Sequence, residues 1–295
     1  FMTSNICDST HAHVRKPPWL RVGLPGYGDF ADVRRQLRHH GLVTVCTEAS
    51  CPNLGECWAH RTLTIMILGD TCTRNCRFCD VQHHPCPAPP DADEPRRVAS
   101  ILSKLGVRYA VITSVTRDDL PDGGAAHWAE VIRYTSEVCQ GVEALVPDFG
   151  GDFTAIDTVL QAHPTVFAHN IETVRRLSPH IRPLADYDRS LAVLSYASQQ
   201  KTVVKSSLLL GMGETQDEVF ETLRNLRNAG VMHLAIGQYL APSRHHAPVE
   251  RFLLPEEFDM LRIAALEMGF SAVLAGPLVR SSYQAHEMAD GNIAR

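Results

Sequence analysis

Two adjacent stretches decide the fold: Leu63–Leu68, with the sequence LTIMIL, and Cys72–Cys79, with the sequence CTRNCRFC. The first is a short apolar run rich in β-branched residues, which is typical of a strand buried on both faces. The second places three cysteines in the spacing CxxxCxxC directly after that strand. Three thiolates occupy three positions of a metal centre and leave one position open. We therefore expect a metal site at the carboxyl end of a buried strand.

Further apolar runs alternate with amphipathic helical stretches along the rest of the chain. The predicted strands after the first are Tyr109–Val115, Val142–Pro147, Thr165–His169, Val203–Leu210 and His233–Tyr239. This alternation indicates a parallel sheet covered by helices, either a barrel or a doubly wound sheet. No GxGxxG motif follows the first strand, which disfavours a dinucleotide-binding sheet. The six strand–helix units predict an α/β fold, a partial (β/α)6 TIM-type barrel with N-terminal and C-terminal extensions, whose chemistry lies at the carboxyl ends of the strands.

Helix boundary signals and composition divide the chain into three parts. The clearest helix starts are Asp93 with Pro95, Thr215 with Glu218, and Pro255, and a short basic helix is expected over residues 31–40, ended by Gly41. We expect an N-terminal extension over residues 1–61, the barrel over residues 62–270 and a C-terminal segment over residues 271–295. A seventh apolar run, Ala272–Ala275, leads into that last segment.

Composition excludes several classes of protein. Apolar residues make up 44% and charged residues 21% of the 295 residues, which is ordinary for a globular protein. The net charge of -5 gives no reason to expect nucleic acid, and no apolar run approaches the length of a membrane span. The start of the chain shows no secretory signal. The nine cysteines are odd in number and clustered, which favours metal ligation in the reducing cytoplasm over disulfides.

A second cysteine triplet precedes the barrel. Cys46, Cys51 and Cys57 are spaced CxxxxCxxxxxC, so the chain carries two triplets and we expect two metal centres, each needing a fourth ligand. Zinc is the competing metal for either triplet. Arg74 and Arg77 lie beside the later triplet; a solvated loop face is the favoured position for both, although either would offset the negative charge of a cluster.

The CxxxCxxC triplet, with Phe78 before its third cysteine, resembles that of the radical S-adenosylmethionine superfamily. The resemblance implies that Cys72, Cys76 and Cys79 hold a [4Fe–4S] cluster whose open iron binds S-adenosylmethionine and cleaves it to a 5′-deoxyadenosyl radical. Together with the earlier triplet, the chain resembles the lipoyl synthase family over nearly its whole length. The other stretches that carry this resemblance are Lys16–Trp19, Arg117–Gly124, His169–Thr173, Gly211–Thr215, Pro242–His246 and Arg280–Tyr283.

The lipoyl synthase resemblance implies a reaction and its partners. Cys46, Cys51, Cys57 and Ser282 would bind an auxiliary [4Fe–4S] cluster that supplies sulfur; Ser281 is adjacent, and the sequence alone does not separate the two serines. Two sulfur atoms would be inserted at C6 and C8 of octanoyl-lysine on a lipoyl carrier domain, either a 2-oxoacid dehydrogenase subunit or the glycine-cleavage carrier protein. A low-potential electron donor such as ferredoxin or flavodoxin would reduce the cluster, and the chain is expected to act as a monomer.

Residues near the ends of the predicted strands are the candidates for contact with S-adenosylmethionine. They are Phe78, Thr113, Asn170, Glu172, Lys205 and Gln238. The alternative for each polar one is a satisfied group in a βα loop. His245 and His246 are expected in a packed or solvated loop rather than at a metal. Two other functions stay open: a sulfur inserter similar to biotin synthase, and a non-catalytic iron–sulfur electron carrier or zinc-binding module.

Overall fold

The computed structural model describes residues 16–21, 33, 35–37, 39–45, 53, 57 and 64–291. Of the first cysteine triplet, Cys57 is among these residues, whereas Cys46 and Cys51 lie outside them. The later triplet and all the predicted strand ends are described.

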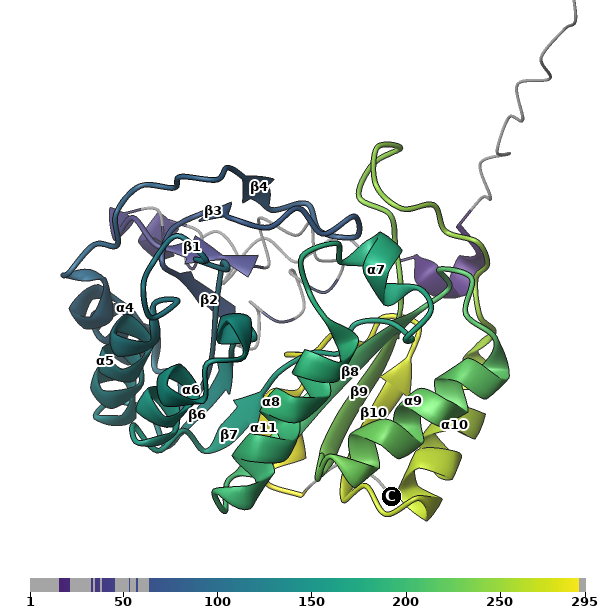
Figure 1. Ribbon diagram of the computed structural model, residues 1–295. Helices are drawn as coiled ribbons and strands as arrows, with labels where there is room; N and C mark the ends of the chain where they lie inside the picture. Colours follow the sequence, from purple (N-terminus) through teal and green to yellow (C-terminus); the bar gives the residue numbers. More distant parts are fainter. Residues whose placement is uncertain are drawn as a thin grey trace, which may run out of the picture.

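One open, curved sheet forms the centre of the molecule (Figure 1). Its strands follow the order β1-β2-β5-β6-β7-β8-β9-β10; all neighbours from β2 to β10 are parallel, and β1 is antiparallel to β2. The strand bounds are β1 Val43–Thr44, β2 Thr64–Ile67, β5 Tyr109–Ser114, β6 Gly141–Leu145, β7 Val166–Ala168, β8 Val203–Leu210, β9 His233–Gln238 and β10 Ala272–Gly276. A separate pair, β3 Thr71–Cys72 and β4 Gln82–His83, lies beyond the carboxyl end of β2.

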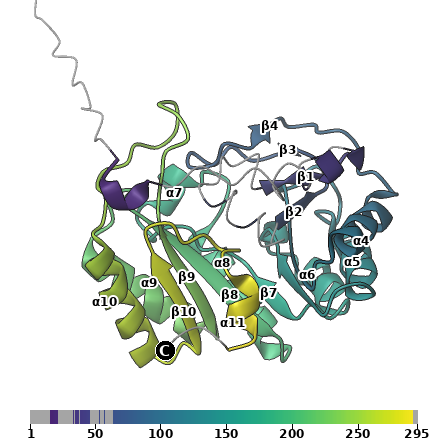
Figure 2. The same cartoon turned by 180° about the vertical axis from the view of Figure 1, so that it is seen from behind.

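Helices alternate with the strands and cover the outer face of the sheet, as seen from both sides in Figures 1 and 2. The long ones are α4 Glu94–Leu105, α5 Ala125–Ser136, α6 Phe153–Leu160, α8 Tyr187–Gln199, α9 Gln216–Asn228 and α10 Pro255–Glu267. Short helical turns are η1 Pro18–Leu20, η2 Phe149–Gly151, α7 Ser178–Ile181 and α11 Ala285–Ala289. The predicted partial barrel is confirmed, and each predicted strand overlaps an observed one.

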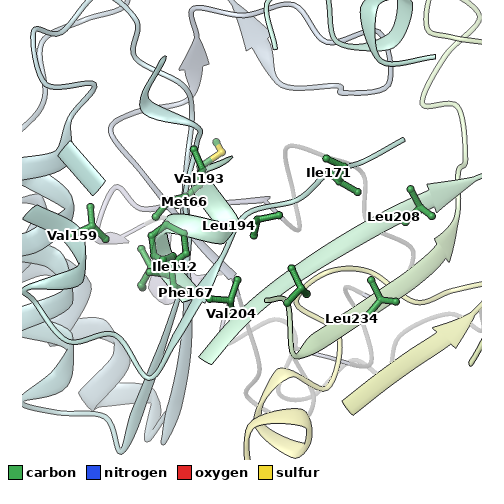
Figure 3. Close-up of a cluster of buried hydrophobic side chains, with 14 of the residues drawn as sticks. Met66, Ile112, Val159, Phe167, Ile171, Val193, Leu194, Val204, Leu208 and Leu234 are labelled. Atoms are coloured by element: carbon green, nitrogen blue, oxygen red, sulfur yellow. The ribbon is translucent and has the colours of Figure 1, made fainter. Parts of the chain in front are cut away.

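The core lies between the sheet and its helices. Ile112, Phe167 and Val204 come from the parallel strands β5, β7 and β8 and are fully buried, and Val193 and Leu194 of α8 are buried in the same cluster (Figure 3). The strands read as continuous apolar runs because the helices cover the outer face while side chains fill the inner one.

The N-terminal and C-terminal extensions each add a strand to the sheet. Ala272 pairs with His233, so β10 of the C-terminal segment adds a strand to the free edge of β9. Val43 pairs with Met66, so β1 of the N-terminal extension covers the edge of β2. An edge strand exposes unpaired backbone groups, and these additions satisfy them.

The predicted helix starts agree with the observed ones, but the N-cap predicted at Asp93 is wrong. Thr215 and Glu218 form the predicted capping box at the start of α9. Asp93 precedes α4 but makes no capping hydrogen bond, because its own backbone is already helical. Val33, residues 35–37 and His39 are helical, and Gly41 follows with a φ of +59°. Among the described residues, no helix combines the length and the apolar character that crossing a membrane requires.

Candidate active site

The turn from β2 into the cysteine loop is held from both sides. Leu68 follows β2 with a φ of +66°, a strained value for a residue with a side chain. Its N–H donates to Glu94 Oε2 at 2.9 Å, and its carbonyl accepts from Arg117 Nη1 at 3.1 Å. Both partners are buried. The surrounding structure therefore fixes the direction in which the cysteine loop leaves the strand.

The motif Arg117–Gly124 builds this support. Arg117 makes two hydrogen bonds of 2.8 Å to the carboxylate of Asp119. Gly124 has a φ of +88°, and a Cβ there would lie 2.6 Å from Cδ1 of Leu68. Only glycine allows this close approach. These contacts are structural, because they position the cysteine loop and take no part in the chemistry.

Cys72, Cys76 and Cys79 line one cavity of about 560 Å³ at the carboxyl ends of the strands. The Sγ of Cys72 accepts backbone N–H groups from Arg74 at 3.4 Å and Thr116 at 3.3 Å. Burial raises the pKa of Cys76, and it raises the pKa of Cys79 to about 12. The free thiols are therefore protonated at neutral pH, and metal binding must release their protons.

The donor set fits an iron–sulfur cluster better than a single ion. Among the residues described, no three Cys, His, Asp or Glu side chains converge as one metal ion would require. A cubane cluster accepts one thiolate at each of several corners, so its ligands stand farther apart. The arrangement of Cys72, Cys76 and Cys79 thus disfavours the zinc alternative for this triplet.

Arg74 lies in a buried ion-pair network. It bonds Asp118 at 2.8 and 2.9 Å and Asp148 at 2.7 and 3.0 Å. Burial alone would raise the pKa of Asp148, but hydrogen bonds and charge from Arg74 hold that pKa well below its usual range. The solvated position predicted for Arg74 is wrong, because two carboxylates draw the guanidinium inward. Arg77 is exposed, as predicted.

We expect Arg74→Met to lower the free energy of unfolding of the metal-free protein by about 3 kcal/mol or more. The substitution leaves the carboxylate of Asp148 buried, with the backbone N–H of Gly150 at 3.0 Å and Arg189 at 3.4 Å as its remaining partners among the described residues. Urea denaturation at pH 7 measures the loss. Arg251→Met is the control, since it removes an exposed pair with Glu257 and should cost less than about 1 kcal/mol.

The same pair gives a dependence on pH with a defined sign. Because the folded pKa of Asp148 is depressed, its stabilisation is complete above the unfolded pKa of about 4 and is lost as the pH falls below it. Wild-type stability should therefore fall more steeply below that pH than the stability of Arg74→Met. Equal stability and equal slopes in the two proteins would contradict this account of Arg74.

Five of the predicted cofactor contacts line the cavity with the cysteines: Phe78, Thr113, Asn170, Glu172 and Gln238. Asn170 and Glu172 follow β7, and Asn170 Nδ2 donates to Glu172 Oε1 at 2.9 Å. Glu172 has a φ of +65°, and burial raises the pKa of its carboxyl. Thr113 donates its hydroxyl to the carbonyl of Leu145. Asn170 and Glu172 thus present an amide and a carboxyl side by side on the cavity wall.

Gln238 lines the cavity but uses its amide elsewhere. Its Nε2 donates to the carbonyls of Leu210 and Arg251 at 3.0 and 3.1 Å, and its Oε1 accepts from Leu253 N at 2.9 Å. The side chain therefore joins the ends of β8 and β9 to the segment before α10.

Lys205 does not reach the cavity. It is fully buried in β8, and its Nζ lies 2.8 and 3.0 Å from the carboxylate oxygens of Glu143 on β6. This placement contradicts the predicted contact between Lys205 and the cofactor. A buried ammonium needs a buried partner, and Glu143 supplies it.

The C-terminal segment brings two serines to the same cavity. Ser281 donates its hydroxyl to Asn170 Oδ1 at 3.0 Å, so that hydroxyl is already engaged. The hydroxyl of Ser282 has no partner in the described part of the chain, and Ser282 lines the cavity with the three cysteines. Tyr283 lines a second cavity, of about 630 Å³, together with Cys57. Ser282 thus shares a cavity with Cys72, Cys76 and Cys79, whereas Cys57, the one described cysteine of the other triplet, lines the second cavity.

Arg182 was not predicted as a site residue. This buried residue lines the cavity, donates from Nη1 to the carbonyl of Ile171 at 3.0 Å and leaves its Nε without a partner among the described residues. Its charge opposes the rise in the pKa of Cys76 that burial causes. Arg182 follows the short helix α7 and belongs to no motif, so only the fold reveals it.

A loop after β9 braces the cysteine loop from the other side. His246 Nε2 lies 3.1 Å from the carbonyl of Cys79, and Ala247 N donates to the carbonyl of Arg77 at 2.7 Å. Since a carbonyl only accepts, Nε2 carries the proton and Nδ1 accepts from Ser243 Oγ at 2.9 Å. His246 is packed and His245 is exposed, so the loop position predicted for both is confirmed.

The comparisons with known proteins decide the family. Residues 66–226 match the model of the radical SAM superfamily. A lipoyl synthase of Anaeromyxobacter sp. (strain Fw109-5) is 51% identical over 278 residues, which cover 93% of this chain and 95% of the relative. The lipoyl synthase of Thermus thermophilus is 52% identical over 275 residues, covering 92% of this chain and 85% of the relative.

The chain belongs to the lipoyl synthase family. The resemblance noted in the sequence is thereby confirmed, and with it the assignment to radical S-adenosylmethionine enzymes. Among solved structures, methylornithine synthase aligns with a TM-score of 0.54 at 15% identity, covering 71% of this chain and 70% of that one. At that identity the likeness supports only the fold that this lipoyl synthase family member shares with it.

Proposed function

We propose that this chain inserts two sulfur atoms, at C6 and C8, into a protein-bound octanoyl-lysine to form the lipoyl group. The observation that carries the proposal is the position of Ser282, whose hydroxyl has no partner among the described residues, in the cavity that Cys72, Cys76 and Cys79 line. A radical enzyme that takes sulfur from a second cluster needs the two centres on one substrate cavity. The cavity of about 560 Å³ is within the size range of small-molecule sites.

The three cysteines of the barrel would hold the first [4Fe–4S] cluster. With the cluster bound, S-adenosylmethionine supplies the carbon radical that removes hydrogen from the octanoyl chain. Asn170 and Glu172 would hold the hydroxyl groups of the cofactor, and Phe78 would pack against it. Arg182 supports this assignment, because its unpartnered Nε leaves a buried positive charge available to an anion in the cavity.

Cys46, Cys51, Cys57 and Ser282 would hold the auxiliary cluster, which serves as the source of sulfur. Ser281 is the poorer candidate because its hydroxyl is bonded to Asn170. An alkoxide ligand is easily protonated and then leaves iron more readily than a thiolate does. Ser282 would therefore hold the cluster until sulfur is needed and release it afterwards.

We expect Glu172→Gln to raise the Kd for S-adenosylmethionine about tenfold or more, with the fold unchanged. The amide keeps the shape of the side chain but removes a charged acceptor, and such hydrogen bonds contribute about 1.5–3 kcal/mol. Equilibrium dialysis of the reconstituted protein measures the affinity. Glu257→Gln, on the exposed start of α10, is the matched control. Unchanged affinity in Glu172→Gln would remove this residue from the cofactor site.

The proposal also fixes the partners. The substrate is an octanoylated lipoyl carrier domain, and a low-potential donor such as ferredoxin or flavodoxin reduces the barrel cluster. We place the reaction in the cytoplasm, where thiols stay reduced, and propose a monomer as the working unit.

Mass spectrometry of an octanoyl-lysyl peptide tests the function. The protein is reconstituted with iron and sulfide without oxygen and then given S-adenosylmethionine and a strong reductant. Replacement of two hydrogens by two sulfurs is the expected result. An unchanged peptide together with released 5′-deoxyadenosine would keep the radical chemistry and assign a different substrate.

A further inference from the structure

Exposed cationic side chains lie on segments next to the residues that line the cavity, and we call them the cationic rim. Its members are Lys16, Arg21, Arg77 and Arg244, and all four are exposed. Lys16 itself lines the cavity. The other members lie close in sequence to cavity-lining residues, with Arg77 next to Phe78 and Arg244 two residues after Pro242.

Backbone contacts hold the segments of the rim together. Arg77 N donates to the carbonyl of Ile181 at 2.8 Å, which joins the cysteine loop to α7. The carbonyl of Arg77 accepts from Ala247 N at 2.7 Å, which joins the same loop to the segment after β9. Figures 1 and 2 both show η1, α7 and the loop after β9 side by side above the carboxyl ends of the strands. The rim is therefore one surface built from distant parts of the chain.

Within the described residues, the charges of this surface are not neutralised. Arg21, Arg77 and Arg244 make no ion pair with any carboxylate there. Some exposed arginines elsewhere are paired, as Arg175 is with Asp188 and Arg176 with Glu218. The whole chain carries a net charge of -5, so a group of cations beside one cavity is a local departure. Such a group attracts acidic surfaces within a Debye length of about 8–10 Å.

Two exposed apolar side chains accompany the cations. Trp19 of η1 is 36% exposed and Leu184, next to the cavity-lining Ala185, is 59% exposed. Tryptophan and arginine are the residue types that most often dominate the energy of protein interfaces. A charged rim with an aromatic side chain beside it fits a folded protein better than a small ion.

We propose that the cationic rim is the docking surface for the carrier domain, and that this domain is acidic around its octanoylated lysine. The proposal rests on the proposed function, which requires a lysyl side chain to enter the cavity from a folded partner. One rim residue, Lys16, lines the cavity that this side chain must enter. An electron donor, in contrast, needs only to approach the cysteine loop and has no need of Arg21 or Trp19 on the opposite segment.

Charge reversal at two rim positions tests the proposal. The double variant Arg21→Glu/Arg244→Glu changes residues outside the cavity lining, and Arg133→Glu/Arg224→Glu makes the same change in charge on the exposed faces of α5 and α9. Affinity for the octanoylated carrier domain is measured by calorimetry at low and physiological salt. The rim variant should bind about tenfold more weakly, mainly through slower association, with a smaller salt dependence. The control should stay within about twofold of wild type.

A short octanoyl-lysyl peptide separates docking from chemistry. The peptide does not extend over the rim, so the rim variant should convert it at the wild-type rate, which also shows that the site is intact. Trp19→Ala provides a second variant, whose loss of carrier affinity should persist at high salt because the contact is apolar.

Three outcomes decide between the possibilities. Wild-type protein that converts neither carrier nor peptide would defeat the proposed function itself. Wild-type conversion together with unchanged carrier affinity in both the rim variant and Trp19→Ala would remove the rim as the docking surface. Unchanged carrier affinity with slower reduction by a flavodoxin or ferredoxin would overturn the proposal in favour of the electron donor.

Discussion

Cys76→Ala should abolish the cleavage of S-adenosylmethionine. Two remaining thiols, Cys72 and Cys79, are too few to hold a cubane cluster with one open iron. The thiol of Cys79 has its pKa raised to about 12 by burial, so without strong metal binding it stays protonated and ligates poorly. The expected result is no 5′-deoxyadenosine by liquid chromatography and a loss of about four iron atoms per chain.

Cys86→Ala is the control for this variant. Cys86 lies a few residues beyond the triplet, is exposed and lines neither cavity. It should keep wild-type cleavage and iron content. Cleavage at the wild-type rate in Cys76→Ala would show that another residue completes the cluster and would end the assignment of this triplet.

Ser282→Ala should separate the two halves of the reaction. The barrel cluster keeps its three cysteines, so 5′-deoxyadenosine formation should continue at a rate close to that of wild type. Sulfur insertion should fall below detection, because the auxiliary cluster loses the ligand that the proposal gives it. Product mass and 5′-deoxyadenosine, measured in the same reaction, give the two readings.

Ser281→Ala is the matched control one residue away. Its hydroxyl bonds Asn170, so its removal should weaken cofactor binding slightly and leave the insertion of sulfur in place. Wild-type lipoyl product from Ser282→Ala would remove Ser282 as a ligand of the auxiliary cluster. Loss of product only in Ser281→Ala would give that role to Ser281, and wild-type product from both variants would remove both serines.

The architecture was predictable because its signal is local. A run such as Val203–Leu210 is mostly apolar on both faces, a pattern that favours a covered parallel strand; β8 has the predicted bounds. The cysteines of the barrel were predictable for the same reason, since their spacing within eight residues is the motif itself. The pairing of the two outer strands, β1 and β10, was not predictable, because it depends on which strand edges remain free in the folded sheet.

The depth of a residue inside the barrel was not predictable. Lys205 and Ser207 point to the same face of β8, yet Ser207 lines the cavity and Lys205 lies below it. The sequence shows the face of a strand but not where the cavity ends along it. Arg74 was misjudged for a related reason, since its partners Asp118 and Asp148 are far from it in sequence. Arg182 was missed because no nearby residue in the sequence indicates that its Nε would be buried without a partner among the described residues.

The bond between Ser281 and Asn170 has a consequence for the timing of biosynthesis. The wall of the cavity is complete only when the segment that carries Ser281 is in place, although the cysteines of the barrel leave the ribosome far earlier. A nascent chain that has reached β9 exposes those thiols in an unfinished, open site. Iron and sulfide should therefore be delivered after the segment with Ser281 has docked, because it completes the wall of the cavity around them.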